Sequence, residues 1–571
     1  MKYLKPKILT FAVLTVLIIG SCTLPNREVQ YDSKHILVNQ VGYPTTGNKT
    51  GLSKIAAGDF RLVDENGQVV FEGKAKEARY WDLSGDTVSA LDFSAFENEG
   101  RYRLCAGGDC SSLFSIGTQL YRPLADAALK SYYYARCSQE IPPQYGGQWI
   151  RKAGHPDTAV FVHASAADAK RPESTIIASP GGWYDAGDYG KYIVNSSITT
   201  WTLLKSLDAN AEVHNNQDLT IPESGNDLPD ILDETLVNLR WMMTMQDPHD
   251  GGVYHKLTTK GFDDFILPEQ TDKPRYVVQK STAAALDFAA TLAYGSRIVG
   301  TYGNPELAGE MKQVALNAWQ WSLENPEVFY EQPEDISTGA YPDTTLTDER
   351  FWAASELYLA TGEERFKTAL EQSYIKPVTP KWDVVQALGV ISLITSDQKD
   401  AFGGIRADFI DYTEGMLARQ SESPYLISME AFAWGSNSDV GNDGMLKIIA
   451  YDLTGDQRYL RAAQNDLDYL LGRNTTGYCF VTGFGSQSPL KPHNRIMAAD
   501  GIEAPIPGYI AGGPNTIVPN DCEPEIVDRS TFPAASYADV QCSYSTNETA
   551  INWNAPLVFL TSGLLRTEGQ D

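Results

Sequence analysis

The stretch GGWYDAGDYGKYIVNSS, Gly181 to Ser197, places Asp185 and Asp188 three residues apart in a turn that is rich in glycine and aromatic residues. Two carboxylates this close can hold a metal ion, cap a helix, or activate a water molecule against a bound substrate. The choice between these roles depends on the rest of the chain.

Length and charge exclude several classes of protein. The chain has 571 residues, more than one ordinary domain contains. Its 73 acidic and 46 basic residues give a formal charge of −27, which repels phosphate backbones, so we expect no nucleic-acid partner. Aromatic residues make up 11% of the chain, and their faces can pack on the C–H faces of sugars, although most aromatic residues of a globular protein belong to its core.

The first residues are typical of an export signal. Three lysines precede an apolar run from Ile8 to Ile19, which is too short to span a bilayer and suits the core of a signal peptide. Gly20 and Ser21 directly before Cys22 resemble a bacterial lipoprotein box, in which cleavage leaves the cysteine as the lipid-bearing first residue. We therefore predict a lipoprotein signal peptide over residues 1–22; an ordinary signal peptide with an incidental cysteine is the alternative.

This anchor predicts where the protein works. We expect an exported protein that is lipid-anchored to a bacterial membrane, in our prediction the outer one, on its periplasmic or cell-surface face. Residues 23–33 would form the tether, and the lipid would be the only membrane contact. An exported protein can form disulfides, and Cys105 with Cys110, in LCAGGDC, can close a hairpin turn. The remaining cysteines are too scattered to pair from sequence.

Two regions with different sequence patterns follow the predicted tether. Residues 34–117 contain short extended runs, and FRLVDENGQVVFEG has two of them around Asn66-Gly67, a strong hairpin signal. From residue 118 to 571, amphipathic stretches carry apolar residues at i, i+3, i+4 and i+7. We predict a small β-sandwich, then about a dozen helices with no strands between them, which favours a closed helical barrel with its site on one face. A helical solenoid is the structural alternative.

Carboxylates near the C-terminus complement the aspartate pair. Glycoside hydrolysis requires one carboxylic acid that protonates the leaving oxygen and a second carboxylate that activates water or attacks the anomeric carbon. The aspartate pair is one candidate half. The segment SYADVQCSYSTNETAINWNAPL, from Ser536 to Leu557, supplies Asp539, Tyr544 and Glu548 as the other. A carboxyl beside aromatic rings can have its pKa raised by lost solvation and so act as the acid.

Two further groups are candidates for sugar binding. His493 and Arg495 end the glycine-rich loop VTGFGSQSPLKPHNR and can donate hydrogen bonds to sugar hydroxyls, although a lone histidine and arginine in a loop are more often structural. Trp183 and Tyr184 stand directly before the first aspartate and offer aromatic faces.

Together these segments resemble glycoside hydrolase family 9, the cellulase family built on an (α/α)6 barrel, in its branch with an N-terminal immunoglobulin-like domain. NQVGYP at Asn39–Pro44 is similar to the opening of that domain, GGWYDAGDYGKY to the family's Asp-Ala-Gly-Asp motif, and YADVQCSYSTNETAINWNA to its second signature. The resemblance covers nearly all of the chain after the predicted signal. It implies a mainly α protein, with an (α/α)6 catalytic domain over 118–571 preceded by an immunoglobulin-like β-sandwich over 34–117.

The resemblance also implies an activity and a role for each residue. The activity is that of an inverting glycoside hydrolase that cleaves β-1,4-glucosidic bonds inside cellulose-type or xyloglucan-type glucans. Asp188 would be the general base, Asp185 would help to position the water, and Glu548 would be the general acid. The other catalytic and cleft residues would be His493, Asp539, Arg495, Tyr544, Trp183 and Tyr184.

No cofactor for catalysis is expected, but the resemblance implies a structural calcium ion. TLTDERFWAASELY resembles a family calcium loop, in which Asp348 and Glu349 would be oxygen ligands, with Asp383 of KWDVVQ as a third. A capped helix start is the alternative.

Zinc is not expected. Some relatives bind it through cysteines and histidines ahead of the aspartate pair, but here Gly154 stands where a cysteine would be required. Cys137, His155 and His163 alone make an incomplete structural set.

Two other functions keep part of these assignments. An exo-acting β-glucosidase or cello-oligosaccharide hydrolase of the same family would share the mechanism and differ in the loops that close the cleft. A catalytically inactive glycan-binding lipoprotein would need only one carboxylate site, so the joint presence of Asp185, Asp188 and Glu548 argues against it. We expect a monomer whose partner is a β-glucan polysaccharide or oligosaccharide.

Overall fold

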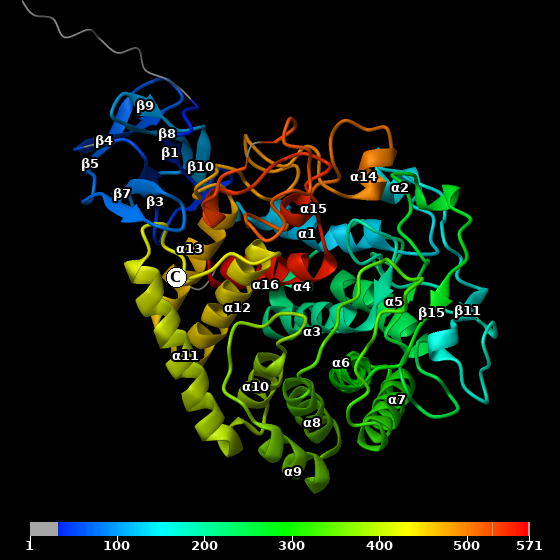
Figure 1. Ribbon diagram of the computed structural model, residues 1–571. Coiled ribbons are helices and arrows are strands. Elements are labelled where there is room, and N and C mark those ends of the chain that lie inside the picture. The colour runs from blue at the N-terminus through cyan, green and yellow to red at the C-terminus, as the bar shows by residue number, and fades with distance from the viewer. Residues whose placement is uncertain (1–31, 57, 528, 569–571) are drawn as a thin grey trace, which may run out of the picture.

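The computed structural model describes residues 32–56, 58–527 and 529–568. The predicted signal peptide, the lipidation site Cys22 and most of the tether lie outside the described residues. The chain forms a β-rich N-terminal domain and a larger helical domain (Figure 1). Among the described residues, no helix combines the length and the apolar character that crossing a membrane requires.

The N-terminal domain is a sandwich of two sheets with strand orders β1-β3-β7-β6 and β2-β10-β8-β4-β5, and β9 pairs with β8. Its strands are β1 (Ile36–Leu37), β2 (Gly42–Pro44), β3 (Thr50–Ser53), β4 (Asp59–Asp64), β5 (Val69–Lys74), β6 (Arg79–Trp81), β7 (Asp86–Asp92), β8 (Gly100–Ala106), β9 (Asp109–Cys110) and β10 (Phe114–Gly117). The predicted hairpin is confirmed, because β4 pairs antiparallel with β5 across a turn in which Gly67 has a φ of 80°. The Cys105–Cys110 disulfide closes the β8–β9 hairpin, as its spacing predicts.

Twelve long helices of the described chain form two layers. The inner helices are α3 (Ile193–Ala209), α6 (Thr282–Thr301), α8 (Thr347–Thr361), α10 (Gln386–Thr395), α12 (Ser436–Thr454) and α16 (Ile551–Thr567). Their outer partners are, in the same order, α5 (Asp230–Thr244), α7 (Pro305–Glu324), α9 (Glu364–Ser373), α11 (Gly403–Glu422), α13 (Gln457–Leu470) and α1 (Arg122–Ala135). Inner helices such as α10 are buried at nearly every residue, whereas α13 is apolar along one stripe, as expected for a helix with one face in solvent.

The last inner helix of the chain returns to the first. Helix α3 packs on α6, α6 on α8 and α8 on α10, while α16 packs on both α12 and α3. Because the last helix of the chain contacts the first inner one, the arrangement is an (α/α)6 barrel and not an open solenoid, which confirms the predicted fold class. Short helices lie in the loops: α2 (Pro143–Gly146), α4 (Ala211–His214), α14 (Arg495–Ala499), α15 (Tyr544–Asn547), and the 3₁₀ turns Ala164–Ala166, Pro268–Gln270, Lys399–Phe402 and Pro533–Ala535.

The expectation that no strands interrupt the helices is wrong. A five-stranded sheet of order β12-β11-β15-β14-β13 lies in the loops of the helical domain. Its strands are β11 (Val160–Val162), β12 (Ile176–Ile177), β13 (Lys191–Tyr192), β14 (Lys256–Thr258) and β15 (Tyr276–Val277). Strands of two or three residues are too short for an alternating pattern to appear in a sequence. The sheet matters because β13 joins the aspartate turn to α3.

The segment NQVGYP fastens the two domains together. Asn39 is fully buried, and its Oδ1 accepts hydrogen bonds from the N–H groups of Val41 and Gly42. Its Nδ2 donates a 2.9 Å hydrogen bond to Asp468 on α13, the helix beside which the sandwich lies in Figure 1. The asparagine therefore shapes its own turn and binds it to the barrel.

Candidate active site

The aspartate turn lies against the segment that carries Glu548. A Cβ atom on Gly187 would lie 2.3 Å from the carbonyl oxygen of His493 and 3.1 Å from Glu548 Oε1. A Cβ on Gly190 would lie 2.7 Å from Asp188 Oδ2. Both glycines are therefore needed for close backbone approach, which explains two of the four glycines of the quoted stretch.

Asp188 is held through one of its two oxygens. Its buried side chain accepts hydrogen bonds at Oδ2 from the N–H of Gly190, at 3.0 Å, and from the hydroxyl of Tyr192, at 3.1 Å. Among the described residues, Oδ1 has no hydrogen-bond partner. The arrangement fixes the carboxylate and leaves one oxygen to accept a proton.

Asp185 is buried and held through both oxygens. Oδ1 accepts a 2.5 Å hydrogen bond from Asn195 Nδ2, and Oδ2 accepts a 2.7 Å hydrogen bond from the hydroxyl of Tyr341. Burial, and next the negative charge of Asp188, raise the pKa of Asp185 to about 7, while the two hydrogen bonds act in the opposite direction. Each oxygen of Asp185 thus accepts one hydrogen bond from the protein, which fixes the carboxylate and leaves it able to accept a further hydrogen bond from a water molecule.

Glu548 completes a group of three carboxyls. Its Oε1 accepts a 3.3 Å hydrogen bond from the N–H of Gly187, in the turn between the two aspartates. Burial, then the charges of Asp188 and Asp185, raise the pKa of Glu548 well above its usual range. The side chain nevertheless keeps some exposed surface. The structure thus brings together Asp185, Asp188 and Glu548, the three carboxyls predicted from the sequence. The environment of Glu548 favours its protonated form.

His493 pairs with Glu548 in a parallel bridge, so the two residues lie side by side. Its Nδ1 lies 2.7 Å from the carbonyl oxygen of Gln541, which can only accept, so Nδ1 carries the proton and Nε2 the lone pair. Burial lowers the pKa of His493 and keeps the ring neutral. The ring meets Phe265 and Tyr544 edge-on, with centroids 5.2 and 5.9 Å apart.

The Arg495 side chain donates hydrogen bonds to two backbone carbonyls. Its Nη1 donates to the carbonyl of Gly187 and its Nε to that of Asp263, each at 2.7 Å. The buried guanidinium also lies 5.2 Å from the ring centroids of Phe262 and Phe265. Two of its donors are thus occupied by the protein, so the predicted contact with sugar hydroxyls is limited to the remaining ones. Its position fixes the aspartate turn.

Asp539 supports the loop that leads to His493. Its Oδ2 accepts from the N–H of Leu490 at 2.8 Å, and its Oδ1 from the N–H of Lys491 at 2.9 Å and from Asn547 Nδ2 at 3.2 Å. Both oxygens are therefore engaged with the loop and with the residue before Glu548.

The assignment of Trp183 and Tyr184 to substrate binding requires correction. The two side chains are 0% and 2% exposed, and the Trp183 indole N–H donates to Glu234 at 2.8 Å. They pack beneath the turn, because adjacency in sequence does not decide on which side of a turn a ring lies. Among the rings near the site, Trp434 is 41% exposed and lies 5.6 Å from the ring of Tyr544, which makes these two the better candidates for stacking on a sugar.

Three polar residues at the site were missed from the sequence. Tyr192 and Asn195 lie within the quoted stretch, at the start of α3, directly after the aspartate pair, and this closeness in sequence was a usable signal. Tyr341 comes from the irregular segment between α7 and α8, where no periodicity or motif indicated it.

A second group of carboxylates surrounds the start of α8. Asp287, Asp343, Asp348 and Glu349 are buried close together, and mutual repulsion adds to burial in raising the pKa values of Asp287, Asp348 and Glu349. Within the described part of the chain, both oxygens of Asp287, both of Glu349 and one of Asp348 lack a hydrogen-bond partner. Asp383 is half-buried near Asp343. Uncompensated buried oxygens of this kind fit a hard cation such as Ca²⁺.

Another acidic group, around Lys280, shows the contrast. One carboxylate oxygen from each of Asp168, Asp247 and Asp250 lies within 4.8 Å of the other two. The ammonium of Lys280 lies 2.8 Å from Asp247 and Asp250 and 3.3 Å from Asp168, and Arg171 lies 3.4 Å from Asp247, so two cations offset much of the negative charge. The group at α8 is less tightly gathered and has no ion pair among the described residues, so backbone or water oxygens would complete the shell of a bound cation there.

The residues considered for zinc have other partners. Cys137 Sγ lies 3.5 Å from both the His155 carbonyl and Asp157 Oδ2. The His155 ring contacts the Tyr184 hydroxyl, at 2.9 Å from Nδ1. His163 lies 3.2 Å from Asp335. Cys137 Sγ, His155 Nδ1 and His163 Nε2 therefore each have a protein partner, whereas His155 Nε2 is buried without one among the described residues.

Comparison with known proteins agrees with this site. Residues 121–561 match glycosyl hydrolase family 9, and residues 32–111 match the cellulase N-terminal ig-like domain. The chain is 41% identical over 587 residues to a xyloglucan-specific endo-beta-1,4-glucanase of Bacteroides ovatus, covering 97% of each chain. It is 32% identical over 557 residues to a cellodextrinase of Butyrivibrio fibrisolvens, covering 93% of this chain and 100% of that one. A solved family 9 structure from Bacteroides ovatus matches with a TM-score of 0.88 at 40% identity, covering 94% of this chain and 99% of that chain.

Proposed function

The chain belongs to glycosyl hydrolase family 9, and on that basis we propose that it is an inverting endo-β-1,4-glucanase. The observation that carries the proposal is the meeting of Asp188, Asp185 and Glu548 at one site, with a hydrogen bond of 3.3 Å from Gly187 of the aspartate turn to Glu548. Glycoside hydrolysis requires an acid and a base together, whereas binding a glycan requires neither.

Glu548 is the general acid of the proposed reaction. Burial and the charges of Asp188 and Asp185 raise its pKa, which favours the protonated form that a general acid requires. It delivers that proton to the glycosidic oxygen as the bond to the leaving sugar breaks. After the reaction it is reprotonated from solvent through its exposed edge.

Asp188 is the general base. Tyr192 and Gly190 fix its Oδ2, and Oδ1 takes the proton of the attacking water. Asp185, held by Asn195 and Tyr341, orients the same water. The water enters opposite the leaving group, so one displacement inverts the anomeric carbon.

The remaining groups shape the cleft. His493 presents a neutral Nε2 as a hydrogen-bond acceptor beside the acid, since its Nδ1 proton is engaged with Gln541. Tyr544 and Trp434 offer aromatic surface, while Arg495 and Asp539 hold the turn and the loop that carry the reacting groups.

The preferred substrate is proposed to be a branched β-1,4-glucan of the xyloglucan type. The 41% identity to a xyloglucan-specific relative over 97% of both chains supports this choice. The test is the time course of products from xyloglucan and from cello-oligosaccharides. An endo-acting enzyme lowers the viscosity of xyloglucan before free sugar accumulates, an exo-acting one releases single sugars from cello-oligosaccharides from the start, and a binding protein releases neither.

Two structural features are proposed along with the activity. A calcium ion is bound by carboxylates at the start of α8, including Asp348 and Glu349, and its role is structural. The mature chain begins at lipidated Cys22, which tethers the enzyme to the outer membrane of a bacterium.

A further inference from the structure

The segment that carries the acid has little structure of its own. Helix α15, directly before Glu548, has 4 residues, and a single turn of helix does not maintain its shape in isolation. The segment from Gln541 to Glu548, here called the acid segment, therefore depends on contacts from elsewhere in the chain for its position.

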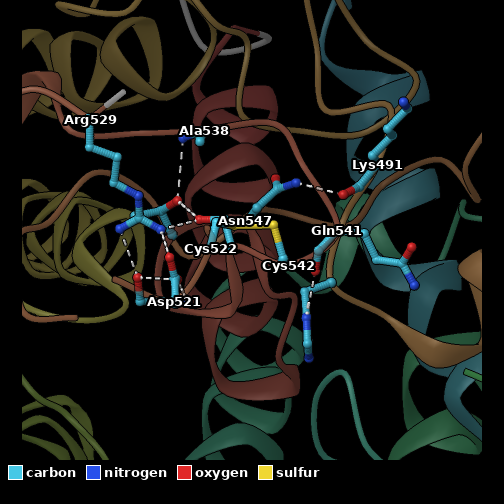
Figure 2. Close-up of a disulfide and its surroundings, with 12 residues drawn as sticks. Lys491, Asp521, Cys522, Arg529, Ala538, Gln541, Cys542 and Asn547 are labelled. Carbon is cyan, nitrogen blue, oxygen red and sulfur yellow. Dashed lines mark hydrogen bonds and ion pairs between the residues drawn. A yellow bond between two sulfur atoms is a disulfide. The ribbon is translucent and has the colours of Figure 1, made fainter. Parts of the chain in front are cut away.

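Those contacts come from residues 512–527 and 529–535, here called the stapled loop. The Cys522–Cys542 disulfide joins the loop to the start of the acid segment, with Cα atoms 5.3 Å apart (Figure 2). The N–H groups of Gly512 and Gly513 donate to the carbonyls of Glu548 and Thr546 at 2.8 and 2.9 Å. The loop and the acid segment thus run side by side from the disulfide to the acid itself.

An ion pair inside the stapled loop holds the middle of the acid segment. Arg529 pairs with Asp521, and their side chains are 5% and 0% exposed. Asp521 Oδ2 accepts from the N–H of Ser545 at 2.9 Å and from its hydroxyl at 2.7 Å. Arg529 donates to the same hydroxyl at 3.0 Å and also to the hydroxyl of Ser543. The pair therefore binds both serines that flank Tyr544.

The opposite side of the acid segment holds the loop of His493. The Gln541 carbonyl accepts from His493 Nδ1 at 2.7 Å, and Asn547 Nδ2 donates to the Lys491 carbonyl at 2.7 Å. Figure 2 shows Arg529 and Asp521 on one side of the disulfide and Gln541 and Lys491 on the other. A shift of the acid segment would therefore displace His493 as well as Glu548.

Burial of this ion pair is unusual for a surface loop. The same loop exposes Ile517 and Ile526 by 60% and 57%, so it does not form a hydrophobic core of its own. Removing an ion pair from water costs much of what its attraction returns, and such pairs contribute more to a defined geometry than to net stability. Holding the acid segment in a defined geometry is a role that accounts for burying this ion pair.

We propose that Arg529, Asp521 and the Cys522–Cys542 disulfide are positioning elements that set Glu548 and His493 relative to the aspartate turn. The inference rests on the proposed function, because it takes Glu548 to be the acid. It assigns to the stapled loop a part in the proton transfer to the leaving group, although none of its side chains touches the reacting atoms.

The test compares a natural glycan with an aryl glycoside whose leaving group needs little protonation. Glu548→Gln serves as the reference and should lose about 10² to 10⁴ in kcat on xyloglucan oligosaccharides, with a smaller loss on 4-nitrophenyl β-cellobioside. Arg529→Gln and the double variant Cys522→Ser/Cys542→Ser should show the same asymmetry at a lower level, with a loss of about 10- to 100-fold in kcat on the oligosaccharides. Arg529→Lys, which keeps the positive charge, should retain part of the kcat that Arg529→Gln loses.

The matched control is Cys105→Ser/Cys110→Ser, which removes the disulfide of the N-terminal domain. It should leave kcat on both substrates within about twofold, because that hairpin is remote from the site. All variants are assayed well below their measured melting temperatures. If Arg529→Gln does not fold, the disulfide variant and the wild-type enzyme treated with a thiol reductant decide the question.

The inference is overturned if the Arg529 and disulfide variants lose activity equally on both substrates, lose none, or change only KM. A failure of the proposed function looks different, since Glu548→Gln would then show no dependence on the leaving group. If Glu548→Gln loses more kcat on the oligosaccharides than on the aryl glycoside but the loop variants do not, the inference about the stapled loop is wrong and the proposed function stands.

Discussion

The backbone N–H of Gly187 donates a hydrogen bond to Glu548 Oε1, so that the turn carrying the base is bound directly to the acid. This contact sets the separation of the two groups, which an inverting enzyme keeps at about 6.5–9.5 Å to admit a water molecule. The Arg495 guanidinium holds the carbonyl of the same glycine from the other side.

Gly187→Ala is expected to lose most activity. The added Cβ would lie 2.3 Å from the backbone oxygen of His493, and the resulting shift would separate base and acid, with a loss of about 10² in kcat/KM. The control is Gly309→Ala on α7, whose Cβ would meet nothing within 4 Å. Steady-state kinetics on xyloglucan checks both variants, and near-normal kcat/KM for Gly187→Ala would contradict the role of the close contact.

Tyr341→Phe is expected to shift the pH profile. The Tyr341 hydroxyl stabilises the charged form of Asp185, whose pKa is about 7, so its removal raises that pKa. Because Asp185 orients the water as a carboxylate, the acidic limb of kcat/KM should move to higher pH. Tyr374→Phe, which loses a 2.7 Å hydrogen bond to the remote Asp408, should leave the limb in place. An unchanged limb in Tyr341→Phe would show that the charge of Asp185 is not required.

Calcium removal is expected to destabilise the barrel. Chelation should lower the melting temperature of the wild type, since a ligand at 100 times its Kd adds about 2.7 kcal/mol. Glu349→Gln should lower it as well and should no longer respond to chelation, whereas Asp250→Asn, from the group that pairs with Lys280, should still respond. A wild-type melting temperature that is indifferent to chelator would refute the calcium site.

The calcium-free enzyme should also respond to pH. Asp287 and Glu349 have folded-state pKa values raised by burial, above those of the unfolded chain. Their contribution to stability is therefore present at low pH and is lost as the pH rises through the folded-state values. Chelated enzyme should melt at a higher temperature under mildly acidic than under neutral conditions, and the opposite trend would contradict this assignment.

Cys22→Ala is expected to abolish membrane attachment, because the thiol is the proposed site of lipidation. The wild-type protein expressed with its signal should partition into the detergent phase, and the variant into the aqueous phase or accumulate unprocessed. Equal partitioning of both into water would remove the lipoprotein assignment.

Much of the architecture could be predicted because it follows from local rules. The Asn66-Gly67 turn specifies its hairpin by backbone conformation, and the apolar period of segments such as α13 specifies helices that need a partner layer. The short strands such as β13 escaped prediction because two residues carry no period. Closure of the barrel by α16 is a long-range contact that no local pattern encodes.

The site was predictable where chemistry and motif coincide, as for Asp188 and Glu548. Tyr341 was missed because it reaches Asp185 from a segment without regular structure, 156 positions along the chain. Trp183 was predicted to bind substrate because aromatic rings pack on sugars, yet its buried indole N–H donates a hydrogen bond to Glu234. The side of a turn on which a ring lies is decided by tertiary packing.

The stereochemistry of the first product tests the central claim most directly. If Asp188 activates a water molecule, the newly formed reducing end from a β-linked glucan is the α-anomer, because the water enters from the face opposite the leaving group. A nucleophilic Asp188 would form a glycosyl-enzyme and release the β-anomer after a second displacement. Proton NMR of the fresh product, recorded before mutarotation, distinguishes the two: we predict the α-anomer, and an initial β-anomer would contradict the roles of Asp188, Asp185 and the attacking water together.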